Sequence, residues 1–110
     1  ICSASIDNVD GKTAFDGWRA GDKAASDVVD MYISYLGCGL TNIVNTFQPE
    51  VLLIGGGICK EGENLTKPLE EIISKEAYCI DPKQSTKLGI CELGNDAGII
   101  GAAFLYTLAE

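Results

Sequence analysis

The longest regular pattern in this chain is an apolar stripe that runs along residues 22 to 47. Apolar residues recur there in steps of three and four, which is the spacing of one face of an α-helix. Asp22 can cap the start of this helix, and Pro49 lies just beyond its end. The pattern therefore predicts one long helix, whose buried stripe is formed by Ala25, Val29, Ile33, Leu36, Leu40, Ile43 and Phe47.

The same helix has a second apolar face, so we expect it to need two partners: its own sheet and another surface. Gly37 and Gly39 lower the helix propensity of its middle. We expect these glycines to permit the close approach of a neighbouring backbone, with a simple bend as the alternative. The residues of the second face are Val28, Met31, Tyr32 and Tyr35.

The segment before the long helix, "TAFDGWRAGD", is predicted to be a short helix. Thr13 and Asp16 have the spacing of a capping box, and Gly21 is a natural stop. Residues 1–11 are small and polar, which indicates a loose lead-in to a folded part at residues 12–110. The whole chain is then a single unit rather than two domains.

Two strands are predicted after the long helix. "EVLLI" at residues 50–54 is apolar without alternation, which is typical of a parallel strand covered on both faces. "KLGICEL" is the second strand, and a helix from about 64 to 78 connects the two as a parallel crossover. Pro68 is expected in the first turn of that helix, where backbone N–H groups are free. The inner face of the helix is predicted to consist of Leu65, Leu69, Ile72 and Ile73.

The last segment, "GNDAGIIGAAFLYTLAE", is predicted to be a helix that Asn95 or Asp96 caps. The fold class is therefore α/β, with the order α-α-β-α-β-α and a parallel strand pair. Two strands are too few for a stable open sheet, so further strands are expected from elsewhere in the polypeptide or from another molecule. The residues predicted to pack inward from the last helix are Ile99, Ile100, Ala103, Phe104 and Leu108.

Composition narrows the function classes. The chain has 110 residues, of which 46% are hydrophobic, and a formal net charge of −8 with no histidine. Such an acidic surface repels phosphate backbones, so direct nucleic-acid binding is not expected. No apolar run is long enough for a membrane span, and no membrane partner is expected.

The five cysteines, at positions 2, 38, 59, 79 and 91, form no CxxC pair and no zinc-ligand spacing, so no metal site is predicted. Free thiols fit a reducing cytoplasm. Cys38 and Cys91 lie within apolar segments and are predicted to be small core residues.

The candidate binding residues follow the first strand. Gly55, Gly56 and Gly57 stand at the carboxyl end of a parallel strand, where ligands of α/β sheets bind. Bare backbone lets a flat ligand approach the main chain, although the tripeptide alone favours a tight turn without a ligand. Asn95 stands at the corresponding end of the second strand and could contact a ribose or a nearby loop. No pair of catalytic carboxylates stands out, so no catalytic residue is assigned.

The stretches "QPEVLLIGGGICKEGENLTKPLEEII" and "CELGNDAGIIGAAFL" together resemble the C-terminal end of the ROK family of bacterial glucokinases, related hexose kinases and NagC-like transcriptional repressors. The resemblance implies the C-terminal part of the large lobe of an actin-like ATPase, a ribonuclease H-like fold. It also implies that Gly55, Gly56 and Gly57 form the adenosine-side loop, with ATP and Mg²⁺ as cofactors of the full-length protein.

The resemblance implies the nucleotide-side subdomain of an ATP-dependent sugar kinase, with a hexose substrate and a cytoplasmic location. The family's phosphate loop and catalytic Asp are not found in this sequence, so we expect no kinase activity from this chain alone. The alternative is the effector-binding or dimerisation region of a NagC-like repressor, which the residues upstream would decide. A homo-oligomer, expected to be a dimer, would form through the helix at 22–47 or through the sheet edges, which sizing chromatography can test.

Overall fold

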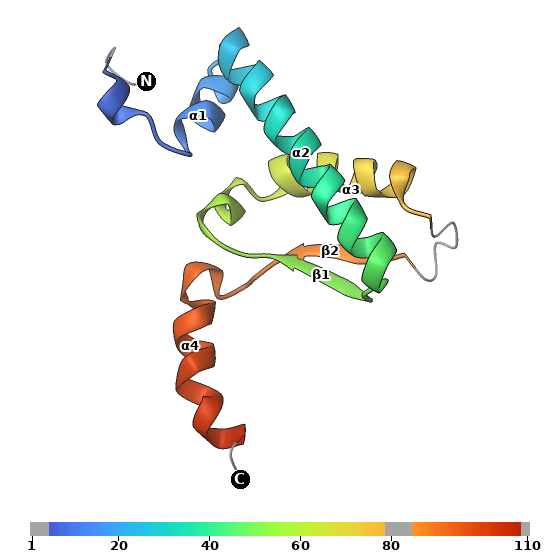
Figure 1. The fold of residues 1–110 in the computed structure, drawn as a ribbon. Coiled ribbons are helices and arrows are strands. Elements are labelled where there is room, and N and C mark those ends of the chain that lie inside the picture. The colour runs from blue at the N-terminus through green and yellow to red at the C-terminus, as the bar shows by residue number, and fades with distance from the viewer. Residues whose placement is uncertain (1–4, 79–84, 109–110) are drawn as a thin grey trace.

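The computed structural model describes residues 5–78 and 85–108, and its elements confirm the α/β class (Figure 1). Helices and strands are joined by four short 3₁₀ turns within the described residues. The main elements are α1 (Thr13–Arg19), α2 (Lys23–Phe47), β1 (Val51–Ile54), α3 (Glu63–Glu76), β2 (Lys87–Ile90) and α4 (Ala97–Phe104). The turns are η1 (Ile6–Asn8), η2 (Gly57–Glu61), η3 (Gly94–Asp96) and η4 (Leu105–Leu108).

β1 and β2 lie side by side and run parallel, as predicted, with α3 in the connection between them. The register pairs Val51 with Lys87 at one end and Ile54 with Ile90 at the other. The backbone N–H of Cys91 donates to the carbonyl of Ile54 at 2.9 Å, so the pairing continues to the point where both strands end. The two carboxyl ends therefore meet at one rim of the sheet.

The hydrophobic core lies between α2, α3 and one face of the sheet. Leu65 and Leu69 of α3 are fully buried, and Leu52 and Ile54 of β1 pack against the same cluster. Full burial of one leucine side chain contributes about 1.5 to 3 kcal/mol, so the two leucines contribute substantially to the stability of this core. The predicted inner face of α3 is confirmed by the burial of Leu65, Leu69 and Ile73 and the partial burial of Ile72.

The buried stripe of α2 differs from the prediction over its second half. Ile43 and Phe47 are exposed, with 40% and 75% of their surface accessible, whereas Thr41 and Val44 are buried. At 3.6 residues per turn Phe47 lies on the same face as the buried Val29, so its exposure comes from the absence of a described element opposite it. The second half of α2 instead turns Leu40 and Val44 towards α3. The hydroxyl of Thr41 is buried without a hydrogen-bond partner.

The ends of α2 agree with the sequence. The Asp22 carboxylate accepts a hydrogen bond from the backbone N–H of Ala25 at 2.7 Å, which is the predicted N-cap. Gln48 ends the helix in the left-handed conformation, with φ of 46°, immediately before Pro49. Pro68 lies beyond the first turn of α3, contrary to the prediction, because the helix already begins at Glu63.

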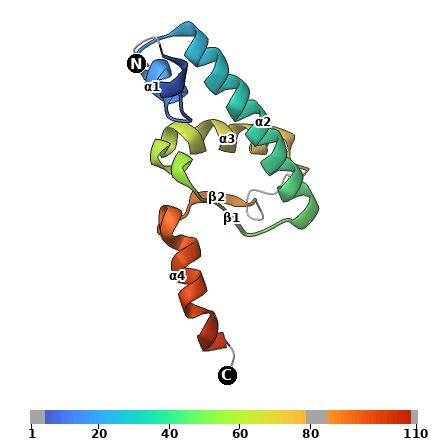
Figure 2. The ribbon, with the colours of Figure 1, turned by 60° about the vertical axis from the view of Figure 1, so that its left-hand side comes forward.

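One face of the sheet is open, which contradicts the prediction that β1 is covered on both sides. Val51 and Leu53 are 53% and 55% exposed, while the alternate residues Leu52 and Ile54 face the core. The reason is that α2 and α3 both lie on the same side of the two strands (Figure 2). A parallel strand needs helices on both faces to be buried, and the described residues place helices on one.

The predicted inward packing of α4 is wrong for this chain. The helix extends away from the sheet in Figures 1 and 2, and its residues Ile99, Ile100, Ala103 and Phe104 are exposed. The described sheet is two strands wide and offers α4 no surface along its path. The Asp96 side chain makes no capping bond at its start, and the side chain of Leu108 lies outside the described residues.

Neither of the two cysteines that were predicted to be core residues is fully buried. Cys38, predicted to be a core residue, is exposed because it lies one position around the helix from the buried Gly37. Cys91 is half-buried, and Cys2 and Cys79 lie outside the described residues. The second apolar face of α2 is exposed at Met31 and Tyr35, so a dimer through this face stays a prediction.

Gly37 fulfils the expectation of close approach, although the neighbour is a side chain rather than a backbone. A Cβ added at Gly37 would lie 2.7 Å from Cδ1 and 2.9 Å from Cγ2 of Ile72 on α3. A Cβ added at Gly39 would meet no atom within 4 Å. Gly37 is thus the position at which α2 and α3 approach each other too closely for a side chain.

We therefore expect Gly37→Val to lower the free energy of unfolding by about 1 to 3 kcal/mol, because the added methyl groups overpack the contact with Ile72. Gly39→Val is the matched control and should change stability by less than about 0.5 kcal/mol. Urea unfolding of both variants measures the difference. The penalty at Gly37 should shrink in an Ile72→Ala background, and equal effects at the two glycines would refute the explanation.

Candidate functional site

The glycine loop (Gly55, Gly56 and Gly57) lies at the carboxyl rim of the sheet, where the sequence predicted it. Gly56 has φ of 91° and ψ of −177°, a conformation that essentially only glycine adopts. Its carbonyl accepts the backbone N–H of Cys59 at 3.2 Å, which begins η2. Gly56 therefore turns the chain sharply from β1 into η2.

The other two glycines are not required by the turn. A Cβ at Gly55 would lie 3.6 Å from the sulfur of Cys91, an ordinary contact, and a Cβ at Gly57 would meet nothing within 4 Å. Neither has the positive φ that would exclude a side chain. The fold therefore does not explain why residue 57 lacks a side chain, and the exposed backbone at this position is available to a ligand.

Two hydrogen bonds fix the root of the glycine loop. The carbonyl of Ile54 accepts the thiol of Cys59 at 3.0 Å and the backbone N–H of Cys91 at 2.9 Å. The first bond draws η2 back towards β1, and the second attaches the same point to β2. The loop is therefore held from both sides at its beginning.

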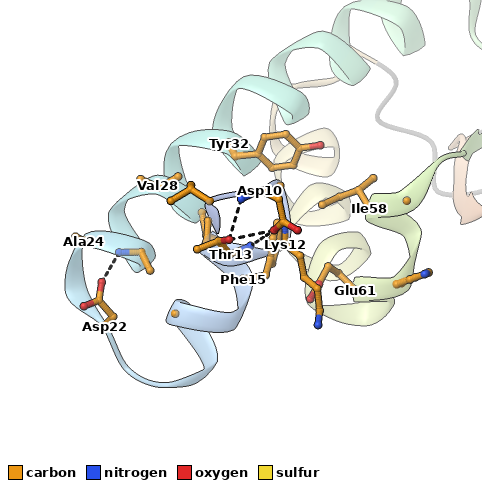
Figure 3. A pocket seen from close by; sticks show the side chains of 18 residues that line it. Asp10, Lys12, Thr13, Phe15, Asp22, Ala24, Val28, Tyr32, Ile58 and Glu61 are labelled. Carbon is orange, nitrogen blue, oxygen red and sulfur yellow. Dashed lines mark hydrogen bonds between the residues drawn. The ribbon is translucent and has the colours of Figure 1, made fainter. Parts of the chain in front are cut away.

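A cleft of about 1080 Å³ opens between η2 and the start of the chain (Figure 3). One wall comes from η2 and includes Gly57 and Ile58, and the other comes from α1 and the first half of α2. Gly57 belongs to this lining, whereas Gly55 and Gly56 do not. The sequence thus predicted one of the three glycines at this cleft, and it did not predict the opposite wall.

The lining of the cleft is mainly apolar. Tyr32 of α2 and Ile58 of η2 lie at its two walls in Figure 3, and Phe15 of α1 packs edge-to-face on Tyr32 with ring centroids 6.2 Å apart. Apolar clefts with a few polar groups are typical of small-molecule sites. The further apolar side chains are Val9, Ala14, Ala24, Ala25, Val28 and Val29.

The charged residues of the lining are three carboxylates, Asp10, Asp22 and Glu61, against two lysines, Lys12 and Lys60. The lining therefore carries one net negative charge. A phosphate group would be repelled on balance, whereas an uncharged ring would not. The cleft therefore suits the apolar part of a ligand better than an anionic part.

Asp10 organises the start of α1. Its Oδ1 accepts the backbone N–H groups of Lys12 at 2.9 Å and Thr13 at 3.0 Å, and also the Thr13 hydroxyl at 3.0 Å. The backbone N–H of Asp10 donates in return to the Thr13 hydroxyl at 2.9 Å. The predicted capping box of Thr13 with Asp16 is therefore wrong: the reciprocal pair lies one turn earlier, between Asp10 and Thr13.

Asp16 takes part in ion pairs instead. It lies 3.5 Å from the ammonium group of Lys12 and is paired with Arg19. The hydrogen bond from Arg19 is the main reason that the pKa of Asp16 is lowered. Arg19 also pairs with Glu61 of η2, and the bonds to Asp16 and Glu61 raise the pKa of the guanidinium. Arg19 thus connects α1 to the turn that follows the glycine loop.

Asn95, the remaining predicted site residue, lies in η3, and its side chain is outside what the structure describes. The backbone of η3 is in contact with η2, so the two strand ends bring these turns together. Gly94 has a φ of 54°, which lets the chain leave β2 sharply. A contact from Asn95 to a ligand stays a prediction.

Residues 5–78 and 85–108 contain neither a metal-binding cluster nor a helix suited to cross a membrane. Within these ranges, His, Cys, Asp and Glu do not gather in groups of three or more that could hold a metal ion. None of the helices in the same ranges combines the length and apolar content that crossing a membrane requires.

The Asp10 cluster predicts a pH dependence. The hydrogen bond from the Thr13 hydroxyl, followed by the bonds from the Lys12 and Thr13 backbones, lowers the pKa of Asp10 below 3.8. A lowered pKa means that the charged form stabilises the folded chain at pH above 3.8, and this stabilisation is lost as the pH falls through the folded-state value. We expect Asp10→Asn, which keeps an acceptor oxygen but does not titrate, to differ from the wild type less at acid pH than at neutral pH.

Urea unfolding at pH values from about 2 to about 7 tests this expectation. Asp7→Asn, which removes another exposed carboxylate nearby, controls for net charge. A constant difference between Asp10→Asn and the wild type at every pH would contradict the assigned role of the carboxylate.

Comparison with known proteins agrees with the resemblance seen in the sequence. A glucokinase from Halalkalibacterium halodurans is 40% identical over 101 residues, which cover 90% of this chain and 30% of that relative. A glucokinase from Thermotoga maritima is 34% identical over 106 residues, or 92% of this chain and 32% of that relative. A beta-glucoside kinase from Klebsiella pneumoniae is 33% identical over 103 residues, or 94% of this chain and 32% of that relative.

The chain therefore spans about a third of the length of these curated relatives. The profile of the ROK family matches residues 2–108, which is nearly the full sequence. This chain belongs to the ROK family.

Proposed function

We propose that this chain is the nucleotide-side part of an ATP-dependent sugar kinase with an actin-like large lobe. The observation that carries the proposal is the glycine loop, which turns at Gly56 and opens through Gly57 onto the apolar cleft. The names of the relatives support the sugar-kinase class. The location at the carboxyl rim of a parallel strand pair is where α/β proteins bind nucleotides.

The cleft suggests how a nucleotide would lie. The purine would enter between Tyr32 and Ile58, where the lining is apolar and a flat ring can stack on the tyrosine. The ribose would lie against the bare backbone at Gly57, on the turn that contacts η3. The phosphates would point out of the cleft, because its carboxylates outnumber its lysines.

Phosphoryl transfer also needs Mg²⁺, a base for the sugar hydroxyl and groups that stabilise charge on the phosphates. These groups would lie in the rest of a longer protein. We propose a hexose as the substrate, with glucose as the first candidate, and a cytoplasmic location. A dimer belongs to the same proposal, formed either through Met31 and Tyr35, the residues of the second face of α2 that do not line the cleft, or through the sheet edges. The repressor alternative is not favoured by any observation on the described residues.

Nucleotide binding gives the direct test, because both walls of the cleft lie within this chain. We expect ATP and adenosine to shift the amide resonances of residues 55–58 and 28–32 in the purified chain. Gly57→Ala should weaken binding by about tenfold, which is about 1.4 kcal/mol, because the methyl group would separate the ligand from the backbone. The fold should survive, since that methyl group meets no atom within 4 Å.

Gly39→Ala, at an open position of α2 outside the lining of the cleft, is the control that should leave nucleotide affinity unchanged. Resonance shifts confined to residues far from the glycine loop, or an unaltered affinity in Gly57→Ala, would refute the proposed binding mode.

Kinase activity tests the assignment to a larger enzyme. We expect no glucose-dependent turnover of ATP by this chain alone, because it supplies the nucleotide side without the groups that act on the sugar. A longer protein that contains this segment should catalyse the reaction and serves as the positive control. Measurable glucose-dependent formation of ADP by the purified 110-residue chain would contradict the proposal.

A further inference from the structure

We propose that the ion pair between Arg19 and Glu61 is a positioning contact that holds α1 against η2 and thereby keeps the cleft in a binding-competent shape. The inference about ligand affinity rests on the proposed nucleotide function. The inference about α1 rests on the geometry of the chain alone.

The pair joins two segments that are 42 residues apart in the sequence. α1 packs mainly on α2, where Phe15 is buried beside Tyr32. η2 follows the glycine loop and precedes α3, so its place is set by β1 and α3. The Arg19–Glu61 pair is thus a direct bond from the α1 wall of the cleft to the η2 wall.

The two side chains differ in exposure, and this difference determines what the loss of the pair would cost. The Glu61 side chain is 8% exposed, whereas that of Arg19 is 41% exposed. A nearly buried carboxylate that loses its cationic partner is left desolvated and unpaired, which is strongly unfavourable. We therefore expect η2 to move, or α1 to detach, when Arg19 cannot reach Glu61.

Arg19 is oriented for this contact by its second bond. One guanidinium nitrogen donates to Asp16 on the same helix while another donates to Glu61. The planar fork of arginine can hold two carboxylates at once, which a lysine cannot do with the same geometry. α1 thus carries a fixed arrangement that selects one position of η2.

The consequence for the cleft follows from what η2 carries. Gly57 and Ile58 lie in this turn a few residues before Glu61 and line the cleft. A displacement of Glu61 would therefore change the separation between Ile58 and Tyr32, the proposed stacking site. Loss of the pair should reduce affinity for adenosine and ATP alike, because the base rather than the phosphate is affected.

Hydrogen exchange and ligand binding on the full 110-residue chain test the proposal together. In Arg19→Gln, amide exchange in α1 should accelerate by about tenfold, while exchange in α3 stays unchanged. The dissociation constants of adenosine and ATP should both rise by at least about fivefold. Glu61→Gln should act in the same direction, and the double variant should be no worse than the more severe single variant.

Lys67→Gln is the matched control, because it removes one positive charge from an exposed ion pair with Glu63 on α3. It should leave both the exchange of α1 and the affinity for adenosine at wild-type values. Arg19→Lys should recover only part of the binding, because the ammonium group cannot serve both carboxylates in the same way.

Unchanged exchange of α1 in Arg19→Gln would overturn the positioning role, and so would accelerated exchange with unchanged affinity. Additive effects of the two single variants would also overturn it. If the wild-type chain binds neither adenosine nor ATP while α1 still responds to the variants, the proposed nucleotide function fails and the structural role of the pair is supported.

Discussion

The close contact of α2 with α3 is the constraint on which the rest of this structure depends. Gly37 lacks the side chain that would hold the two helices apart, and Ile72 fills the space that this glycine leaves. The contact places Leu65 and Leu69 in a core that also receives the inner residues of β1. The position of β1 relative to the helices, and hence of the glycine loop at its end, follows from this packing.

The sequence could predict the elements of this core because each of them has a local signal. The spacing in α2 and α3, the cap at Asp22, the stop before Pro49 and the apolar run of β1 depend only on neighbouring residues. Which side of an element becomes buried depends on its partners. Phe47 and Val51 have the same apolar character as the core residues, yet both are exposed because no described element lies opposite them.

In the candidate site too, features that depend on neighbouring residues could be predicted, and features that depend on contacts between distant segments could not. The glycine loop could be predicted because a strand followed by three glycines is a local pattern. The second wall of the cleft could not be predicted, because it forms only when α1 and the first half of α2 come to lie opposite η2 in the folded chain. The pair of Arg19 with Glu61 has no periodic signal at a separation of 42 residues. The capping role of Asp10 did have a local signal, an aspartate three residues before a threonine, and was missed.

The cleft and the exposed apolar surfaces lie on different elements of the chain, which matters for the proposed function. The cleft has both of its walls within the described residues, one from α1 and the first half of α2 and the other from η2. α4, whose residues are exposed, lies at the end of the ribbon opposite to α1 in Figure 1, and the open face of β1 is turned away from the core. A two-stranded sheet with one bare apolar face is unstable unless further strands or helices cover it. In the proposed kinase, whose relatives are about three times as long, the remaining strands would pack on this bare face and leave the nucleotide cleft accessible.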